Sequence, residues 1–72
     1  MANMNKLRGK IIENGMTIET LSEAVGINRA TFYRKIADNG ASFTIREADV
    51  IMRTLHLSAE DAFAIFFSPN VA

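Results

Sequence analysis

The sequence predicts an all-α protein, with a single domain of five short helices over residues 1–72. Three observations predict this fold class. Apolar residues recur every three or four positions along most of the chain, which is the spacing of one face of an amphipathic helix. Residues that favour helix ends, mainly Asn, Thr, Ser and Gly, separate these stretches. No segment shows a convincing alternation of apolar and polar residues of the kind that marks a half-buried strand.

The first helix is predicted between Asn3, a favourable N-cap, and Asn14-Gly15, where both residues tolerate the left-handed conformation that ends helices. Its opposite faces differ in character. The outer face is mostly basic, with Lys6, Arg8 and Lys10. Two interpretations of that face are open, a solvated surface or a surface beside phosphates or a protein partner. The core face is expected to hold Met4, Leu7, Ile11 and Ile12.

Residues 17–37 have the pattern of a helix, a tight turn and a second helix. Thr17 is placed to cap the first of these helices. Gly26 follows that helix directly, and a glycine adopts positive φ without steric cost, so the chain turns sharply there. Asn28 is placed to cap the second helix. This unit is therefore predicted to be a helix-turn-helix, and the inward side of its first helix is expected to hold Leu21, Ala24 and Val25.

The second helix of this unit runs from about Arg29 to Ala37, and its apolar side is predicted at Phe32 and Ile36. Arg34 on the other side is long enough to form two hydrogen bonds with a guanine edge, and its small neighbours permit close approach to a thymine methyl. Basic side chains and helix N-terminal amides suit phosphates. An ordinary surface helix is the alternative. The candidate DNA-binding residues are Arg29, Ala30, Thr31, Tyr33, Arg34 and Lys35.

Two further helices are predicted from capping boxes, in which a hydroxyl and an acidic side chain three residues later satisfy each other's free amides. Thr44-x-x-Glu47 begins the fourth helix, and Ser58-x-x-Asp61 begins the fifth, which is followed by a short tail over residues 68–72. Phe67 adjoins this tail and is the phenylalanine expected to be exposed. The core residues of these helices are expected to include Ile45, Ala48, Met52, Leu55, Phe63 and Phe66.

Length and composition exclude several functions. A chain of 72 residues buries only about 60% of the surface that its unfolded form exposes, so a deep catalytic cleft is hard to enclose. There is no cysteine, and the single His56 cannot build a zinc centre alone, so a solvated or capping role is expected for it. No pattern in the sequence indicates a general base placed beside a serine or threonine, as nucleophilic catalysis would require. We therefore expect no enzyme, no metal, no cofactor and no small-molecule ligand.

The sequence gives no sign of membrane insertion or export. No apolar run approaches the roughly 20 residues of a membrane span, and the N-terminus lacks the apolar core of a signal peptide. We expect a cytoplasmic protein without a membrane partner.

Charge is balanced in total but unevenly distributed. Residues 1–37 hold six basic and three acidic residues, a balance of +3, and residues 38–72 hold two basic and five acidic residues, a balance of −3. A formal net charge of zero argues against binding to nucleic acid by bulk electrostatics. Moderate DNA affinity with a weak dependence on salt is the most that we expect.

The stretch LSEAVGINRATFYRKI resembles the helix-turn-helix of the Cro and repressor class of temperate phages. The downstream stretch FTIREADVIMRTLHLSAEDAFAIFF resembles the rest of the small Cro-like regulators in phages of Gram-positive bacteria, and the pattern is closest to the modulator-of-repression proteins of lactococcal phages. One position departs from the motif, because Lys35 stands where the commoner residue is apolar. The matching apolar and turn positions are Leu21, Ser22, Val25, Gly26, Ile27 and Phe32.

This resemblance implies a lambda-repressor-like fold and a transcriptional regulator of the lysis/lysogeny switch in a bacterial host. By analogy, a symmetric homodimer would read operator half-sites about one helical turn apart. The protein would bind operator DNA alone or together with the phage repressor. The residues that the analogy places in the major groove are Asn28, Arg29, Ala30, Tyr33 and Arg34.

A second hypothesis is an antirepressor or modulator that binds the phage repressor and blocks its DNA-binding surface. Acidic residues would neutralise the basic surface of the repressor, and an exposed phenylalanine would provide an apolar anchor. A helical bundle without a regulatory role is a third alternative. The candidate partner-binding residues are Glu19, Glu23, Asp38, Glu47, Asp49 and Phe67.

Overall fold

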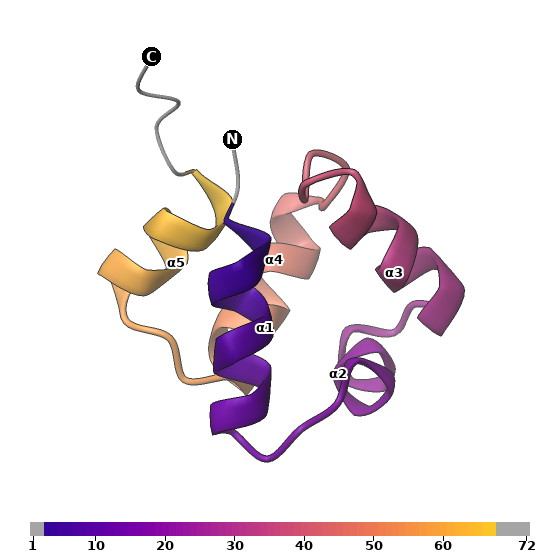
Figure 1. The fold of residues 1–72 in the computed structure, drawn as a ribbon, viewed down its shortest axis with the longest axis horizontal. Coiled ribbons are helices and arrows are strands. Elements are labelled where there is room, and N and C mark those ends of the chain that lie inside the picture. The colour runs from indigo at the N-terminus through magenta and orange to yellow at the C-terminus, as the bar shows by residue number, and fades with distance from the viewer. Residues whose placement is uncertain (1–2, 68–72) are drawn as a thin grey trace.

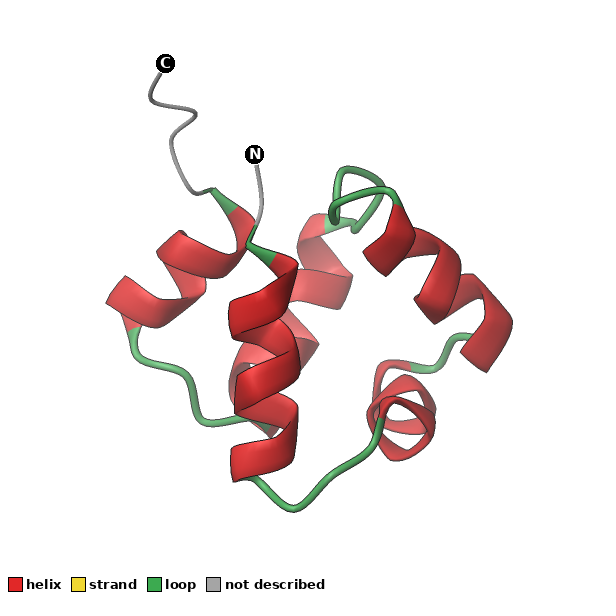
Figure 2. Cartoon of the chain, in the orientation of Figure 1, coloured by secondary structure: helices red, strands yellow, loops and turns green. Residues whose placement is uncertain are grey.

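The computed structural model describes residues 3–67 and contains five α-helices in that range (Figure 1). Figure 2 shows that only turns and loops connect them, and residues 3–67 contain no strand. The predicted all-α fold is therefore confirmed. The expected tail over residues 68–72 lies outside the described residues. The helices are α1 (Met4–Glu13), α2 (Ile18–Val25), α3 (Arg29–Ala37), α4 (Ile45–Thr54) and α5 (Ala59–Phe66).

The helices form two groups around one core. α2 packs against both α3 and α4, while α1 packs against α5. In Figure 1, α2 and α3 lie on the right and α5 on the left, with α1 and α4 between them. Aromatic rings connect the groups, because the ring of Phe43 makes edge contacts with Phe32 on α3 and Phe66 on α5. The buried apolar residues are Met4, Leu7, Ile11, Leu21, Val25, Phe32, Ile36, Ile51, Leu55 and Ile65.

Every predicted N-cap accepts a hydrogen bond from the first turn of its helix, but the two capping boxes differ. Thr44 Oγ1 accepts from the Glu47 amide, and Glu47 Oε1 accepts in return from the Thr44 amide at 2.9 Å. Ser58 Oγ accepts from the Asp61 amide, yet the Asp61 carboxylate does not return to Ser58. The second box is therefore only half formed.

The Asp61 carboxylate instead joins α5 to α1. Its two oxygens lie 3.0 Å from Lys6 Nζ and 3.1 Å from Lys10 Nζ. The hydrogen bonds from Lys6 and Lys10 hold the pKa of Asp61 below its usual value, and the same contact raises the pKa of Lys10. Lys6 and Lys10 are thus engaged in ion pairs within the molecule, while Arg8 stays exposed.

Four residues expected in the core are exposed instead. Ile12 and Ala24 each adjoin a buried residue, and the rotation of 100° per residue places them at the edge of the buried stripe. Ile45 is the first residue of α4 and is 89% exposed. Phe63 lies two residues from buried Ile65, which turns it by about 200° to the outer side of α5, where it is 56% exposed.

His56 directly follows Leu55, the C-cap of α4, and adopts the left-handed conformation with φ of +53°. The Leu57 amide donates to the Met52 carbonyl at 3.0 Å, which closes the last turn of the helix. His56 is exposed and has the capping role that was one of its predicted alternatives. Residues 3–67 contain no cluster of metal-ligating side chains and no helix of sufficient length and apolarity to span a bilayer.

Candidate nucleic-acid interface

The turn between α2 and α3 has the predicted geometry. Gly26 adopts φ of +83°, and its amide donates to the carbonyls of Ser22 and Glu23. Asn28 then caps α3, because its Oδ1 accepts from the Ala30 amide at 2.7 Å. α3 therefore starts at Arg29, three residues after Gly26, and the helix-turn-helix is confirmed.

Packing fixes which side of α3 faces solvent. Phe32 and Ile36 are buried in the core, and the Phe32 ring contacts Phe43 with centroids 5.3 Å apart. Ser22 is buried on α2, and its hydroxyl donates to the Glu19 carbonyl, so this small residue presents no unsatisfied group where the helices pack. The side of α3 opposite Phe32 and Ile36 must consequently point outward.

The exposed side of α3 carries the small and basic residues that the sequence indicated. Ala30 and Arg34 are exposed, and Tyr33 is 46% exposed. Thr31 is half-buried, and its hydroxyl accepts a long hydrogen bond of 3.4 Å from Arg34 Nη2. Within residues 3–67 Arg34 forms no ion pair, so its guanidinium keeps donors for a base edge or a phosphate.

Arg29 lies at the start of α3 and has a partner on α2. Its Nη1 is 3.1 Å from Glu19 Oε2, and both side chains are more than half exposed. Exposed ion pairs of this kind contribute at most about 1 kcal/mol, so a phosphate can compete with the carboxylate. Arg29 therefore stays a candidate phosphate contact.

The structure corrects the expectation that Lys35 contacts phosphates. Lys35 Nζ donates to the Ser42 carbonyl and to Glu47 Oε1, each at 2.9 Å, and the side chain is only 15% exposed. The ammonium also lies 5.8 Å from the centroid of the Phe43 ring. Lys35 thus occupies the apolar position of the motif because its stem packs inward and its charge is neutralised there.

The structure also corrects the expectation that Glu47 binds a protein partner. Glu47 is buried, and its carboxylate is used by the Thr44 amide and by Lys35. Burial raises the pKa of Glu47, but the hydrogen bond from the Thr44 amide and the contacts with Lys35 outweigh burial and hold the pKa below its usual value. This carboxylate is therefore a structural anion that is inaccessible to another protein.

The other candidate partner residues lie on two separate surfaces. Glu19 and Glu23 are exposed on α2. Phe67, by contrast, lines one hollow together with Asp38 at the end of α3 and a second hollow together with Asp49 on α4. The sequence treated them as one group, but the fold separates them.

Sequence reasoning missed the role of Arg46. Its Nη2 donates to the Val25 carbonyl at 3.0 Å and so connects α4 to the last turn of α2. Arg46 lies in the first turn of α4, where a positive charge is unfavourable beside the helix dipole. A cation in the first turn of a helix indicates that its side chain is stabilised by a hydrogen-bond acceptor in another segment, and this feature of the sequence could have indicated the contact of Arg46.

The fold and the exposed side of α3 define a helix-turn-helix DNA-binding domain. The family model of the Cro/C1-type HTH DNA-binding domain matches residues 6–67, and the chain belongs to this family. Comparison with curated proteins and with solved structures found no match. The family is one of DNA-binding regulators, so the chain is assigned to transcription regulation rather than to catalysis.

Proposed function

We propose that this chain is a phage-type transcriptional regulator of a lysis/lysogeny switch, which binds operator DNA through α3, alone or together with the phage repressor. The observation that carries the proposal is the division of α3. Phe32 and Ile36 are buried, while Ala30 in the first turn, Tyr33 at the middle and Arg34 in the last turn are exposed on the other side of the helix. Side chains on the exposed side of a recognition helix reach base edges when the helix enters the major groove.

The phage setting is supported by the resemblance of residues 21–36 and 43–67 to small Cro-like regulators and to lactococcal modulator-of-repression proteins. In the proposed complex, Asn28 and Arg29 lie near the backbone of the DNA at the start of α3. Two copies of the chain would bind half-sites about 34 Å apart. Because Lys35 is engaged inside the molecule, few cations remain for phosphates, and we expect a weak dependence of affinity on salt.

Arg34 provides the sharpest test of DNA binding. The experiment is a mobility-shift or fluorescence-anisotropy titration of the regulatory region from the same genome, at low salt. Arg34→Ala is expected to cost about 1–3 kcal/mol of binding free energy and to relax the preference at one base position. Arg53→Ala, which removes the same charge from an exposed position on α4, is the matched control. If no fragment of the regulatory region is shifted, operator binding by the chain alone is refuted.

An antirepressor is the second candidate function, and one observation favours it. Of the three cations on α3, Lys35 is bound to Glu47 and Arg29 is paired with Glu19. Because the net charge is also zero, α3 offers little free positive charge to DNA. The acidic side chain of Glu23 is exposed on α2, where it can contact a basic partner. In this mode the chain binds the phage repressor and covers the DNA-binding surface of the repressor.

Mixing the chain with the phage repressor, with and without operator DNA, separates the two functions by size-exclusion chromatography with light scattering. Joint DNA binding predicts a complex that contains both proteins and DNA. The antirepressor predicts a complex of the two proteins that releases the operator, and Glu23→Lys is expected to weaken it. If the two proteins elute separately under both conditions, the antirepressor and the joint complex are both excluded.

A further inference from the structure

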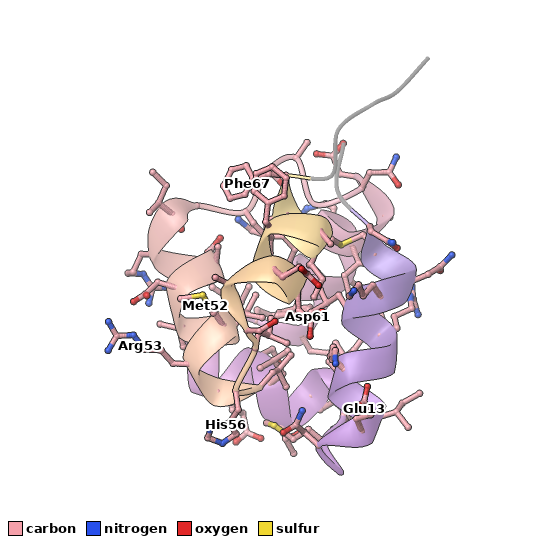
Figure 3. All side chains as sticks on the ribbon, turned by 90° about the vertical axis from the view of Figure 1, so that its left-hand side faces the viewer. Glu13, Met52, Arg53, His56, Asp61 and Phe67 are labelled. Carbon is pink, nitrogen blue, oxygen red and sulfur yellow. The ribbon has the colours of Figure 1, made fainter. Side chains whose placement is uncertain are left out.

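A second surface lies away from the exposed side of α3, where α4 and α5 meet the loop before α4. It contains two adjoining hollows of about 450 Å³ and about 230 Å³. Both hollows are lined by the same four apolar residues, and Met52 lines the smaller one. Figure 3 shows Met52 on α4 and Phe67 at the end of α5 on this side of the molecule. We refer to it as the α4–α5 surface and define it by Ile45, Ala48, Met52, Phe66 and Phe67.

The α4–α5 surface exposes large apolar side chains that the core does not use. Ile45 is 89% exposed and Phe67 is 63% exposed. The exposed ring of Phe63 extends the surface, because its centroid lies 6.0 Å from that of Phe67. A contiguous apolar patch of this kind on a small domain marks a binding surface for another macromolecule.

The charges at the edges of this surface indicate the chemistry of its partner. Asp38 lines the larger hollow and Asp49 the smaller one, and no basic residue lines either. Within residues 3–67 Asp38 forms no ion pair, and Asp49 shares its charge only with Arg53 in an exposed contact. A second copy of the chain would add further carboxylates and no lining cation. Basic groups from a different protein would instead neutralise these carboxylates.

We propose that the α4–α5 surface binds a protein helix that inserts apolar side chains into the two hollows and places Arg or Lys beside Asp38 and Asp49. This inference goes beyond DNA binding by α3 and does not depend on it. The exposed residues of α3, namely Ala30, Tyr33 and Arg34, line neither hollow. The proposed protein site and the proposed DNA-binding site therefore share none of these three side chains.

The test is a titration of the ¹⁵N-labelled full chain with two synthetic amphipathic helical peptides, followed by NMR. The peptides share their apolar residues and differ in having Arg and Lys or Glu at the flanking positions. The basic peptide is expected to bind at least about ten-fold more tightly and to shift the amides of residues 38–48 and 62–67. Phe67→Ala and Ile45→Ala are each expected to weaken binding about ten-fold or more.

Ile12→Ala is the matched control for Ile45→Ala, since both isoleucines are exposed and Ile12 lies on α1, outside the two hollows. Asp38→Asn removes one carboxylate from an exposed position and is expected to weaken binding of the basic peptide about three-fold, whereas binding of the acidic peptide should not weaken. Equal binding of the two peptides, or shifts confined to α2 and α3, would overturn the proposal. Concentration-dependent shifts of the same amides without peptide would make a second copy the occupant and would also overturn it.

Discussion

Glu47 and Asp61 occupy the same position, the third residue of a helix that begins with a capping hydroxyl, but the fold uses them differently. Glu47 is buried, returns to the Thr44 amide and neutralises Lys35 on α3. Asp61 is partly exposed, accepts no hydrogen bond from the Ser58 amide and forms ion pairs with Lys6 and Lys10 on α1. One carboxylate therefore fixes the end of α3, and the other joins the first helix to the last.

The position of the nearest cation explains the difference. Glu47 returns to the N-cap amide, as the capping box requires, and Lys35 lies beside it. The two lysines of α1 lie one turn apart and face Asp61, so this carboxylate pairs with them instead. A capping pattern thus predicts where a helix begins but leaves the partner of the acidic residue to the tertiary fold.

Removal of Glu47 should have the largest effect on stability. Glu47→Ala leaves the ammonium of Lys35 without its buried partner and frees the Thr44 amide, so we expect a loss of about 2–4 kcal/mol in the free energy of unfolding. Urea unfolding at neutral pH measures this loss. Glu60→Ala, at an exposed position in the first turn of α5, is the control and should change stability little. Equal losses for both variants would show that the buried pair has no special role.

A double variant tests whether Lys35 and Glu47 act as a unit. Lys35→Met keeps an unbranched stem beside Phe43, and Glu47→Gln keeps an oxygen for the Thr44 amide. The double variant is expected to be more stable than the sum of the single losses predicts, with a coupling energy of about 1–2 kcal/mol. Additive losses in urea unfolding would exclude this coupling.

Acid should remove the contributions of both carboxylates. The pKa values of Glu47 and Asp61 are lowered by folding from their ordinary values of 4.5 and 3.8. Their stabilisation is therefore complete above these ordinary values and is lost as the pH falls through the lower pKa values of the folded state. Unfolding measured between about pH 2.5 and 6 should show this loss, and Glu47→Gln should reduce its slope. An unchanged slope in that variant would assign the acid sensitivity to other groups.

The smallest effect is expected for Asp61→Asn, and salt distinguishes it from the effect of Glu47. The pairs of Asp61 with Lys6 and Lys10 are accessible to solvent, so added salt should screen them. We expect the stability difference between Asp61→Asn and the unmodified chain to shrink in about 1 M NaCl, where the screening length is about 3 Å. The loss caused by Glu47→Ala should persist in the same salt. Equal salt sensitivity of the two losses would contradict the distinction.

Local signals gave most of the fold in advance. The caps at Asn3, Thr17 and Thr44 and the turn at Gly26 depend on residues close in the chain, and all of them are present in the structure. Periodicity also identified the buried side of α3, and the helix-turn-helix class agrees with the matched family. The phage setting and the choice between DNA and a repressor as main partner stay predictions.

Contacts between distant segments were not predictable from these signals. Lys35 faces inward because Glu47, twelve residues later, and the Ser42 carbonyl are placed beside it by the packing of α4. Ile45 on α4 and Phe63 on α5 each stand at near-helical spacing from other apolar residues of their own helix. Both nevertheless lie outside the core. Periodicity gives the apolar positions of a helix, whereas the neighbouring helices decide which of those positions are covered.

The hydrogen bond from the Asn3 amide to the Ile65 carbonyl, 2.7 Å long, has a consequence for the order of folding. It closes a loop between residues 3 and 65, whereas the contacts of α2 with α3 connect adjacent helices. Long loops close at a greater entropic cost, so we expect the helix-turn-helix to form first and α5 to dock late and detach first. Because α5 forms half of the α4–α5 surface, a partner bound there would slow amide hydrogen exchange in α5 and in α1 together.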